Sequence, residues 1–305
     1  MEPKESQGSG HGQLYLLGHG ISHSHSPRFH NAMYAALSLP WRLDLLDTTD
    51  AEALPPLMKT PSFVGASVTM PHKVAATKMV DSMTEAARTV QAVNTIYVRT
   101  DPDSGVRKYI GTNTDCIGIR DSIVRNYPSL AEAGRGRPAV VLGGGGASRA
   151  AIYALSKLMG ASEVYLVNRD AGELRQVVAD LAAVGFPAKC TTVVTPEEAQ
   201  SLPSPGIIVG AVPDVPPGTE AERKARAVMT AFLDKPVKGV LLDMCYHPSP
   251  ETQLMALARR SGWSVVNGTE AFLYQAVAQD SLWTQRAVDE LTVETARAAL
   301  LSSHI

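Results

Sequence analysis

A run of four glycines joins two segments of opposite pattern, and this junction limits the possible folds more than any other part of the chain. In "AVVLGGGGASRAAIYAL", residues 139–155, an apolar run typical of a buried strand ends at Gly143, and a helical pattern follows Gly146. A second apolar run, "EVYLV" at 163–167, completes a strand–helix–strand unit. A lone glycine run would fit an ordinary flexible turn equally well. This context instead predicts a parallel α/β sheet with a dinucleotide at the helix N-terminus, where glycine lets the backbone approach a pyrophosphate.

The residues after the second strand bear on which dinucleotide binds. An acidic side chain there binds the ribose 2′-hydroxyl of NAD, whereas an arginine accommodates the 2′-phosphate of NADP. The chain offers Asn168, Arg169 and Asp170, with Glu173 shortly after them. Arg169 argues for NADP, but the two acids would repel a phosphate, so the pattern is divided and leans toward NAD. The glycine fingerprint is also imperfect, because Ser148 stands at its third glycine position.

Length and composition describe an ordinary globular protein of about two domains, at roughly 150 residues each. The 305 residues are 45% hydrophobic and 19% charged, and the formal net charge of -2 gives no reason to expect nucleic acid as a partner. The three cysteines lie far apart and fit neither a disulfide framework nor a metal pair. No run approaches the ~20 apolar residues of a membrane span, and no secretory signal is visible. We therefore expect a cytoplasmic protein without a metal or a membrane contact.

Two α/β series follow one another along the chain, which predicts a first domain at 14–126 and a Rossmann-type domain at 127–269. The first domain reads as an open, mostly parallel sheet that ends in a hairpin, and it includes a helix at 72–81. Residues 1–13, rich in glycine and serine, are expected to be disordered. The final segment, 270–305, has an almost wholly helical pattern, and we expect it to pack back on the first domain.

Two charged residues in polar segments at strand ends are candidates for catalysis, because open α/β sheets place ligands there. They are Lys73 in "SVTMPHK" and Asp115 in "GTNTD". A lysine held beside a carboxylate can move a proton and polarise an oxygen, as the oxidation of an alcohol requires. Taken singly, a surface lysine and a helix-capping aspartate are the simpler interpretations.

Several motifs together resemble the shikimate/quinate dehydrogenase family, and its fungal quinate dehydrogenase branch in particular. They occur in the family's order from about residue 14 to 285: "ISHSHSPRFHNAMY", "SVTMPHK", "AVNTI", "GTNTD", "GGGGASRA", "VNRD" and "FLYQA". The resemblance implies a first domain that binds substrate, completed by the C-terminal helices. It also implies an oxidoreductase that interconverts quinate and 3-dehydroquinate, or shikimate and 3-dehydroshikimate, by hydride transfer with NAD or NADP.

The resemblance assigns a role to each motif residue. Lys73 and Asp115 are the catalytic pair, and Ser24 and Ser26 bind the substrate carboxylate. The ring hydroxyls are held by Thr69, Asn94, Tyr246 and Gln275. The cofactor is bound by Gly143, Gly145, Gly146, Ala147, Ser148, Asn168, Arg169, Asp170 and Val212.

The chain departs from the family pattern at several positions. Gln91 replaces the usual glycine before "AVNT", and Cys116 replaces the glycine after "NTD". Glu173 stands where members that use NADP carry a second arginine, which favours NAD. The family's "NTTP" turn is here "GAVP", residues 210–213. Substrate preference between quinate and shikimate stays open, and so does the choice between a monomer and a homodimer.

The histidine-rich segment "ISHSHSPRFH" suggests other functions, which we weighed. His23 and His25 could both bind zinc only in a loop, and no second metal-ligand motif accompanies them. A serine hydrolase would need a nucleophile elbow, which the sequence lacks. We instead expect Ser24 and Ser26 to share one side of an extended segment, and His30 and His72 to be structural. A catalytically weak sensor of quinate or shikimate with the same fold is the remaining alternative, although the chain keeps both Lys73 and Asp115.

Overall fold

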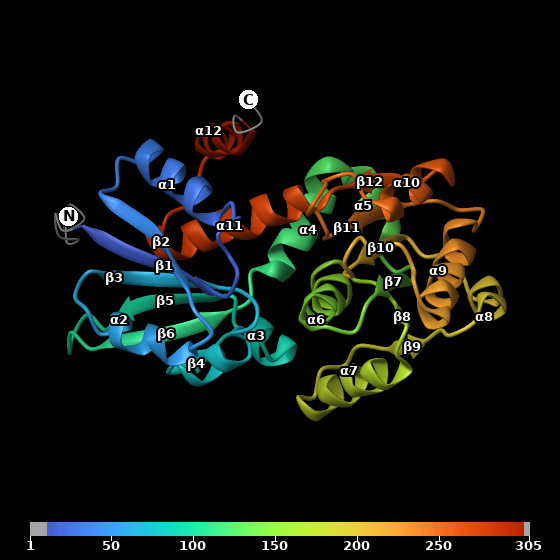
Figure 1. Cartoon of the computed structure of the whole chain (residues 1–305), viewed down its shortest axis with the longest axis horizontal. Coiled ribbons are helices and arrows are strands. Elements are labelled where there is room, and N and C mark those ends of the chain that lie inside the picture. Colours follow the sequence, from blue (N-terminus) through green and yellow to red (C-terminus); the bar gives the residue numbers. More distant parts are fainter. Residues whose placement is uncertain (1–10, 302–305) are drawn as a thin grey trace. The chain divides into compact units, whose positions relative to one another are not determined.

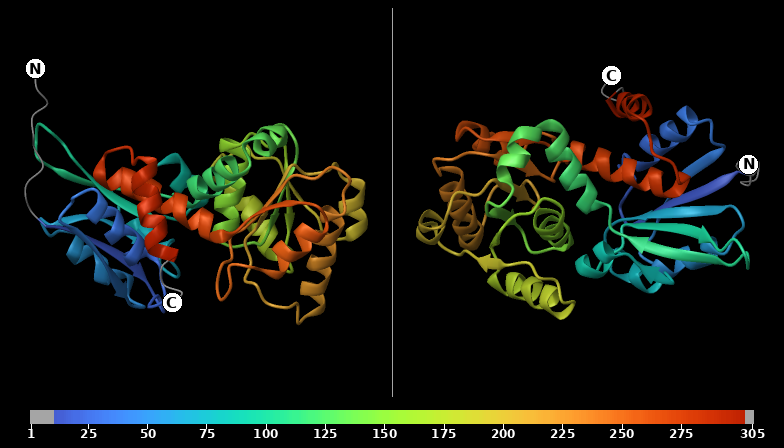
Figure 2. Two further views of the ribbon diagram at one scale, coloured as in Figure 1. Left: turned by 90° about the horizontal axis from the view of Figure 1, so that it is seen from above. Right: turned by 180° about the vertical axis from the view of Figure 1, so that it is seen from behind.

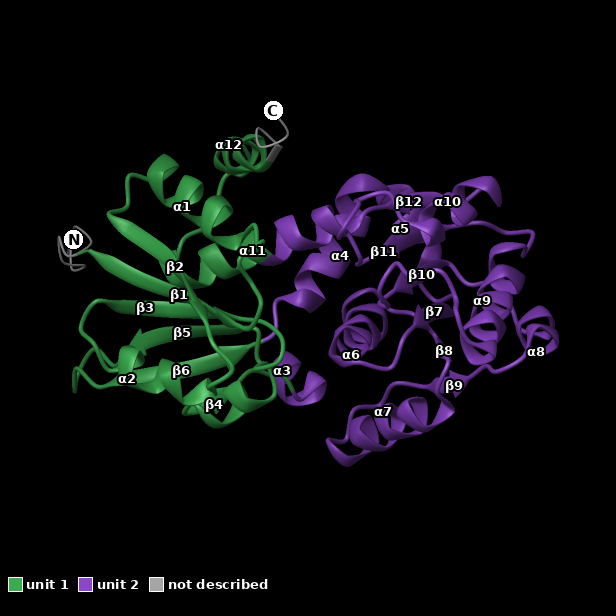
Figure 3. Cartoon of the chain, viewed as in Figure 1, with its two compact units in different colours: residues 1–84, 92–112, 276–305 green, residues 85–91, 113–275 purple. Residues whose placement is uncertain are grey.

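The computed structural model describes residues 11–301, and the chain divides into two compact units (Figure 1, Figure 3). Unit 1 comprises residues 1–84, 92–112 and 276–305, and unit 2 comprises residues 85–91 and 113–275. The domain bounds expected from the sequence stay a prediction. The disorder predicted for residues 1–10 lies outside the described residues, whereas the first strand already begins at Gly12.

Unit 1 is built on a mixed sheet of six strands in the order β2-β1-β3-β5-β6-β4. β1, β2 and β3 are parallel, β5 runs antiparallel to β3 and β6, and β4 pairs in parallel with β6. The antiparallel β5–β6 pair is the hairpin that the sequence predicts. The strands span Gly12–Gly18 (β1), Trp41–Asp47 (β2), Phe63–Val68 (β3), Ser82–Met83 (β4), Thr95–Thr100 (β5) and Arg107–Thr112 (β6).

Helices of unit 1 join segments that are distant in the sequence. The predicted contact of the C-terminal segment with the first domain is confirmed, because α12 packs against α1. In addition, His30 Nδ1 of α1 lies 2.9 Å from Asp280 Oδ1 of α11, and both side chains are fully buried. Burial raises the pKa of Asp280. The helices span Ser26–Ala36 (α1), Ala51–Ala53 (η1), Leu54–Met58 (α2), Ala75–Lys78 (η2), Gly268–Thr284 (α11) and Glu290–Leu301 (α12). Of α11, residues 276–284 belong to unit 1 and residues 268–275 to unit 2.

The helix predicted for residues 72–81 is wrong, because the structure has only a single 3-10 turn there. A helix would need the carbonyl of Lys73 to accept a hydrogen bond four residues on, from Thr77. The Lys73 carbonyl instead accepts from Val93 N at 2.8 Å, and Thr77 N donates to Val74 O. A tertiary bond has therefore taken the place of the helical one.

Unit 2 contains a fully parallel sheet in the order β12-β11-β10-β7-β8-β9. This is the doubly wound order of dinucleotide-binding sheets, in which the first strand lies at the centre. The Rossmann-type domain predicted from the glycine run is thus confirmed as a fold. Its strands span Ala139–Leu142 (β7), Val164–Val167 (β8), Cys190–Thr192 (β9), Ile207–Gly210 (β10), Val240–Asp243 (β11) and Ser264–Val266 (β12).

Helices lie on both faces of this sheet (Figure 2), so its central strands are buried on both sides. On one face, Tyr165 of β8 stacks on Phe232 of α9 with ring centroids 5.6 Å apart. The helices span Glu85–Val90 (α3), Asp115–Asn126 (α4), Pro128–Gly134 (α5), Gly146–Tyr153 (α6), Ala154–Leu158 (η3, a π-helical turn), Ala171–Ala183 (α7), Pro196–Ser201 (α8), Glu220–Leu233 (α9) and Gln253–Arg260 (α10). Within residues 11–301, none of the helices has the length and apolar character needed to cross a membrane.

Candidate active site

One edge of the unit 1 sheet gathers the predicted substrate residues of that unit. The carboxyl ends of β1, β2, β3 and β6 meet there with the amino end of β5, as the strand registers show. The segments that leave this edge carry Ser24 and Ser26 after β1, Thr69 and Lys73 after β3, and Asn94 before β5. Five predicted residues from three segments are therefore brought to the same edge.

The two serines lie at the start of α1, in a geometry that differs from the expected one. The segment is not extended, because residues 22–23 form a turn and His25 already has helical backbone angles. Ser26 is the first residue of α1, and its N–H donates to Ser24 Oγ at 3.2 Å. This hydrogen bond brings the two serines together, whereas the expected extended segment would have placed their side chains on the same side of a strand.

The loop that carries the serines is anchored to the end of β2. Gly20 N and Ile21 N donate to the two carboxylate oxygens of Asp47, at 2.8 and 3.1 Å. The hydrogen bond from Gly20 is the main cause that lowers the pKa of Asp47. A carboxylate that holds two successive backbone N–H groups fixes the path of the chain toward Ser24.

The segment from Thr69 to Lys73 is held on three sides. Thr69 N donates to Leu17 O at 2.8 Å, which ties it to β1. His72 is buried, and its Nε2 lies 2.8 Å from Thr48 O, after the end of β2. The carbonyl of Lys73 accepts from Val93 N, which ties it to the residue before Asn94. The backbone of Lys73 is therefore fixed beside Asn94 at the sheet edge.

A second group of predicted residues gathers in unit 2. Asp115 is the first residue of α4, and its N–H donates to Asn113 Oδ1 at 3.1 Å. The preceding Thr114 donates through Oγ1 to Gln275 Oε1 at 3.2 Å. Burial is the main cause that raises the pKa of Tyr246, and the negative charge of Asp115 adds to it. Asp115, Tyr246 and Gln275, which come from three separate segments, are thus close together.

Close packing explains why residue 118, on α4 beside this second group, is a glycine. A Cβ on Gly118 of α4 would lie 2.9 Å from the Cβ of Gln275 on α11. Real Cβ atoms essentially never approach so closely, so a side chain at this position would push the two helices apart. The small residue keeps Gln275 against the first turn of α4.

The glycine loop between β7 and α6 has the form that a pyrophosphate requires. Gly143 has φ +129°, which favours glycine, and a Cβ there would lie 2.8 Å from Ala211 O. A Cβ on Gly145 or Gly146 would meet nothing within 4 Å, so the loop is open on the side of the helix N-terminus. Ser148 is fully buried, and within residues 11–301 its Oγ has no hydrogen-bond partner. The loop therefore fits a dinucleotide.

The acids after β8 have different roles from those that the sequence suggests. The carboxylate of Asp170 caps α7, accepting from Gly172 N at 2.6 Å and more weakly from Glu173 N. The carboxylate of Glu173 accepts from Asn168 Nδ2 at 2.6 Å. Glu173 Oε2 also lies beside the glycine loop, 2.9 Å from the position that a Cβ on Gly144 would take. Of these two acids, Glu173 lies beside the loop and Asp170 caps the helix.

Arg169 is paired with a residue that sequence reasoning missed. Its Nη1 lies 2.5 Å from Glu222 Oε1, in the first turn of α9. Backbone hydrogen bonding from Thr219 and the bond from Arg169 lower the pKa of Glu222 to about 2. The two residues are 53 positions apart, and a capping box around Thr219 explains Glu222 on its own. No sequence signal therefore pointed to this pair.

Val212 follows β10 and is only half-buried, with its side chain packed on the hydrophobic core of unit 2. The neighbouring Ala211 N donates to Leu142 O at 2.8 Å, which ties this turn to the end of β7. The turn therefore lies next to the start of the glycine loop within unit 2.

Comparison with known proteins identifies relatives of the whole chain. Residues 16–96 match the family model described as the shikimate dehydrogenase substrate binding domain. The quinate dehydrogenase of Emericella nidulans is 40% identical over 304 residues, which cover 94% of this chain and 92% of that protein.

Solved structures share the fold along nearly the full length. The shikimate 5-dehydrogenase of Thermus thermophilus, solved with NADP(H) and shikimate, has a TM-score of 0.72 at 27% identity and covers 94% of this chain and 99% of its own. The quinate dehydrogenase of Corynebacterium glutamicum, solved with NAD, has a TM-score of 0.77 and covers 96% of this chain and 100% of its own. At 22% identity, the second likeness carries the fold alone.

Proposed function

This chain belongs to the shikimate and quinate dehydrogenase family, and on that premise we propose that it oxidises a ring hydroxyl of quinate to the ketone, reversibly and with NAD. The enzyme class is that of oxidoreductases acting on an alcohol with NAD or NADP. The gathering of Ser24, Ser26, Thr69, Lys73 and Asn94 at one edge of the unit 1 sheet carries the proposal. Shikimate is the second substrate to test, since it shares the carboxylate and the ring hydroxyls.

In this proposal the hydroxyls of Ser24 and Ser26 bind the substrate carboxylate. Both lie at the amino end of α1, where the helix dipole favours a negative charge. Thr69 and Asn94 bind ring hydroxyls from the same sheet edge. Tyr246 and Gln275 of unit 2 bind further hydroxyls.

Lys73 and Asp115 form the proposed catalytic pair. The neutral amine of Lys73 receives the proton of the reacting hydroxyl, and the ammonium that forms returns this proton in the reverse direction. The carboxylate of Asp115 accepts a hydrogen bond from a substrate hydroxyl and so orients the substrate. The nicotinamide, when bound, supplies the hydride chemistry.

Residues Gly143 to Ser148 would hold the pyrophosphate, and Glu173 would bind the adenosine ribose. We infer a preference for NAD from two contacts. Glu173 places a carboxylate beside the loop, where a 2′-phosphate would be repelled. Arg169, which could otherwise bind that phosphate, is already paired with Glu222.

Steady-state kinetics of the purified protein, with quinate and shikimate each crossed with NAD and NADP, test the proposal. The highest kcat/KM is expected for quinate with NAD. Turnover with shikimate and NADP alone would overturn both the substrate and the cofactor assignment. Saturable binding of quinate without turnover under either cofactor would replace the enzyme with a ligand sensor.

A further inference from the structure

A buried chain of polar side chains in unit 1 ends on Asn94. We propose that Gln279 and Thr95 are positioning residues, which fix the side-chain amide of Asn94 as a hydrogen-bond donor toward the substrate. This inference rests on the proposed function, in which Asn94 binds a ring oxygen. Neither Gln279 nor Thr95 is among the residues that the motifs assign.

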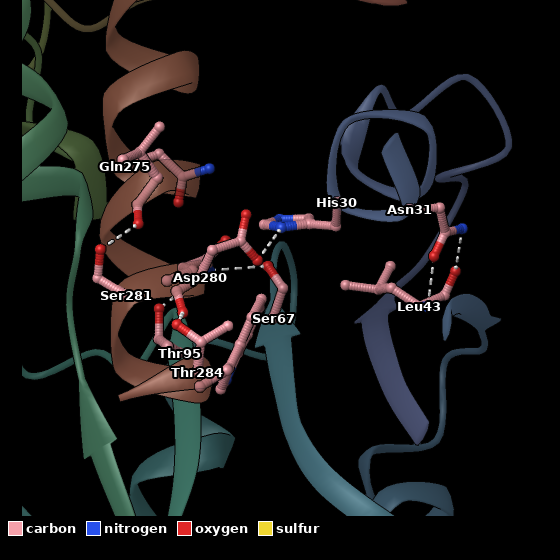
Figure 4. A network of polar contacts seen from close by, with 12 residues as sticks. His30, Asn31, Leu43, Ser67, Thr95, Gln275, Asp280, Ser281 and Thr284 are labelled. Atoms are coloured by element: carbon pink, nitrogen blue, oxygen red, sulfur yellow. Dashed lines mark hydrogen bonds and ion pairs between the residues drawn. The ribbon is translucent and has the colours of Figure 1, made fainter. Parts of the chain in front are cut away.

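Gln279 lies on α11 and is fully buried. Figure 4 shows two of the residues that it contacts, Ser67 and Thr95. Its Nε2 is within hydrogen-bond distance of three oxygens. They are Thr95 Oγ1 at 2.9 Å, Ser67 Oγ at 3.1 Å and the carbonyl oxygen of Asn94 at 3.2 Å. One side-chain amide therefore joins the strand that leads to Thr69 and Lys73 to the strand that begins after Asn94.

The donor and acceptor atoms of these groups fix the direction of each hydrogen bond. The carbonyl oxygen of Asn94 can only accept, so the NH₂ end of the Gln279 amide must face it. Thr95 Oγ1 then accepts from Gln279 and has a single proton to donate. That proton goes to Asn94 Oδ1, at 2.7 Å. Because Oδ1 accepts from Thr95, the donor end of the Asn94 amide, Nδ2, is turned to the other side.

The backbone of Asn94 is already fixed by its neighbours. Its N–H donates to Thr112 O at 3.0 Å, and its carbonyl also accepts from Val68 N at 2.7 Å. These backbone bonds do not by themselves decide which end of the side-chain amide, its oxygen or its nitrogen, is turned toward Thr95. The hydrogen bond from Thr95 selects one of these two orientations.

A donor amide suits a reversible oxidation of an alcohol. An alcohol oxygen and a ketone oxygen both accept hydrogen bonds, whereas only the alcohol can also donate one. An amide that presents Nδ2 therefore binds the reduced and the oxidised forms alike. An amide that presented Oδ1 would lose its partner and face a second acceptor when the ketone forms.

Four variants separate this role from a merely structural one. Thr95→Val removes the hydroxyl at nearly constant volume, Thr95→Ser keeps it, and Gln279→Met removes the amide. The matched control is Thr284→Val, since Thr284 is also a buried threonine of unit 1. Its hydroxyl donates to the helix carbonyl of Asp280 at 2.7 Å and accepts from Arg286 N at 3.3 Å. Each variant is assayed for kcat, for KM of quinate and for the dissociation constant of NAD.

We expect kcat/KM for quinate to fall about 10- to 100-fold in Thr95→Val and Gln279→Met, because a misplaced binding group is costly in the transition state. Thr95→Ser and Thr284→Val should stay within about threefold of the wild type, and NAD affinity should not change. The double variant Thr95→Val/Gln279→Met should lose no more than the worse single variant, because both act through Asn94. Equal losses in Thr95→Val and Thr284→Val, or additive losses in the double variant, would overturn the proposal.

A second measurement makes the outcome independent of turnover. In protein labelled with ¹⁵N-asparagine, the Asn94 side-chain NH₂ signals, assigned with Asn94→Asp, should be sharp in the wild type and in Thr95→Ser. They should broaden or shift in Thr95→Val and Gln279→Met as the amide loses its fixed orientation. Unchanged signals in these two variants would refute the positioning role, whether or not the wild type turns over a substrate. Absence of turnover in the wild type would by itself refute only the proposed function.

Discussion

Lys73 lies on a loop that is hydrogen-bonded to three neighbouring segments, so the position of its backbone is fixed. Replacing it by alanine should lower kcat with quinate about 10²- to 10⁴-fold, the usual contribution of a proton-transfer group, with little change in substrate affinity. Lys78→Ala is the matched control, because Lys78 is an exposed lysine in the same loop region. A Lys73→Ala enzyme with near-normal kcat would exclude Lys73 from the chemistry.

Gln91 adopts a backbone conformation that favours glycine, the residue that the family resemblance leads us to expect at this position. Its φ is +57°, in the left-handed region that costs a side chain about 1–2 kcal/mol. Its Oε1 lies 3.4 Å from Arg149 Nη1, too long for a strong bond. We expect Gln91→Gly to raise the free energy of unfolding by roughly 0.5–1 kcal/mol in urea titrations, after the greater chain entropy of glycine is subtracted. Gln91→Ala, which keeps the Cβ and loses the amide, should show no such gain.

Asp243, at the end of β11, is a buried carboxyl with a raised pKa. Burial raises that pKa from 3.8 to about 6, although Thr252 Oγ1 donates to the carboxylate at 2.6 Å. Between these two values the folded chain binds more protons than the unfolded one, so stability from this group is present below pH 4 and lost as the pH rises through 6. Relative to Asp243→Asn, the wild type should lose about 2 kcal/mol of unfolding free energy between pH 4 and pH 7. Parallel urea curves for the two proteins across this range would contradict the assignment.

In the proposed function, the turn β7–α6 binds the pyrophosphate of the cofactor, and the turn β8–α7 binds its adenosine ribose. Glu173→Arg should raise kcat/KM with NADP relative to NAD by about tenfold or more, because it removes a repelling carboxylate and adds a phosphate ligand. Glu222→Gln should shift the ratio in the same direction, because it releases Arg169 from its partner on α9. Glu220→Gln, in the same helical turn, is the control. An unchanged cofactor ratio in both Glu173→Arg and Glu222→Gln would rule out this basis for selectivity.

Elements with a strong local pattern were predictable, and those fixed by distant bonds were not. The strand–glycine–helix junction and the β5–β6 hairpin have their periodicity and turn residues in the sequence itself. The 72–81 segment has a helical pattern, but Val93 takes the hydrogen bond that a helix would need from Lys73. The serine segment alternates like a strand, yet the α1 helix begins at Ser26.

The same distinction holds for the site. Motif residues such as Lys73 and Asn94 could be named from the resemblance, and the structure brings them to one sheet edge. Their assigned roles stay predictions. Glu222 and Gln279 could not be named, because each acts through a partner that is 53 or more positions away in the sequence.

For the whole molecule, the two units should respond differently to the two ligands. NAD should slow amide hydrogen exchange in unit 2, at residues 143–148 and 168–173. Quinate should protect residues 19–26 and 69–73 of unit 1 as well as the first turn of α4 in unit 2. At a hundred times the dissociation constant, protection of about 100-fold is expected for segments that exchange only by opening of the bound site. Exchange measured by mass spectrometry with each ligand alone checks this, and protection of the glycine loop by quinate alone would contradict it.

The hydrogen-bond chain that ends on Asn94 also has a consequence for how selectivity evolves. The Thr95 hydroxyl donates to whichever neighbour accepts. In this proposal, a substitution at position 279 would therefore change the orientation of the Asn94 amide, although Asn94 itself is unchanged. Two relatives with identical motif residues need not therefore recognise the same arrangement of ring oxygens. Libraries aimed at new hydroxy-acid substrates should accordingly vary α11 around Gln279 and leave the motif residues intact.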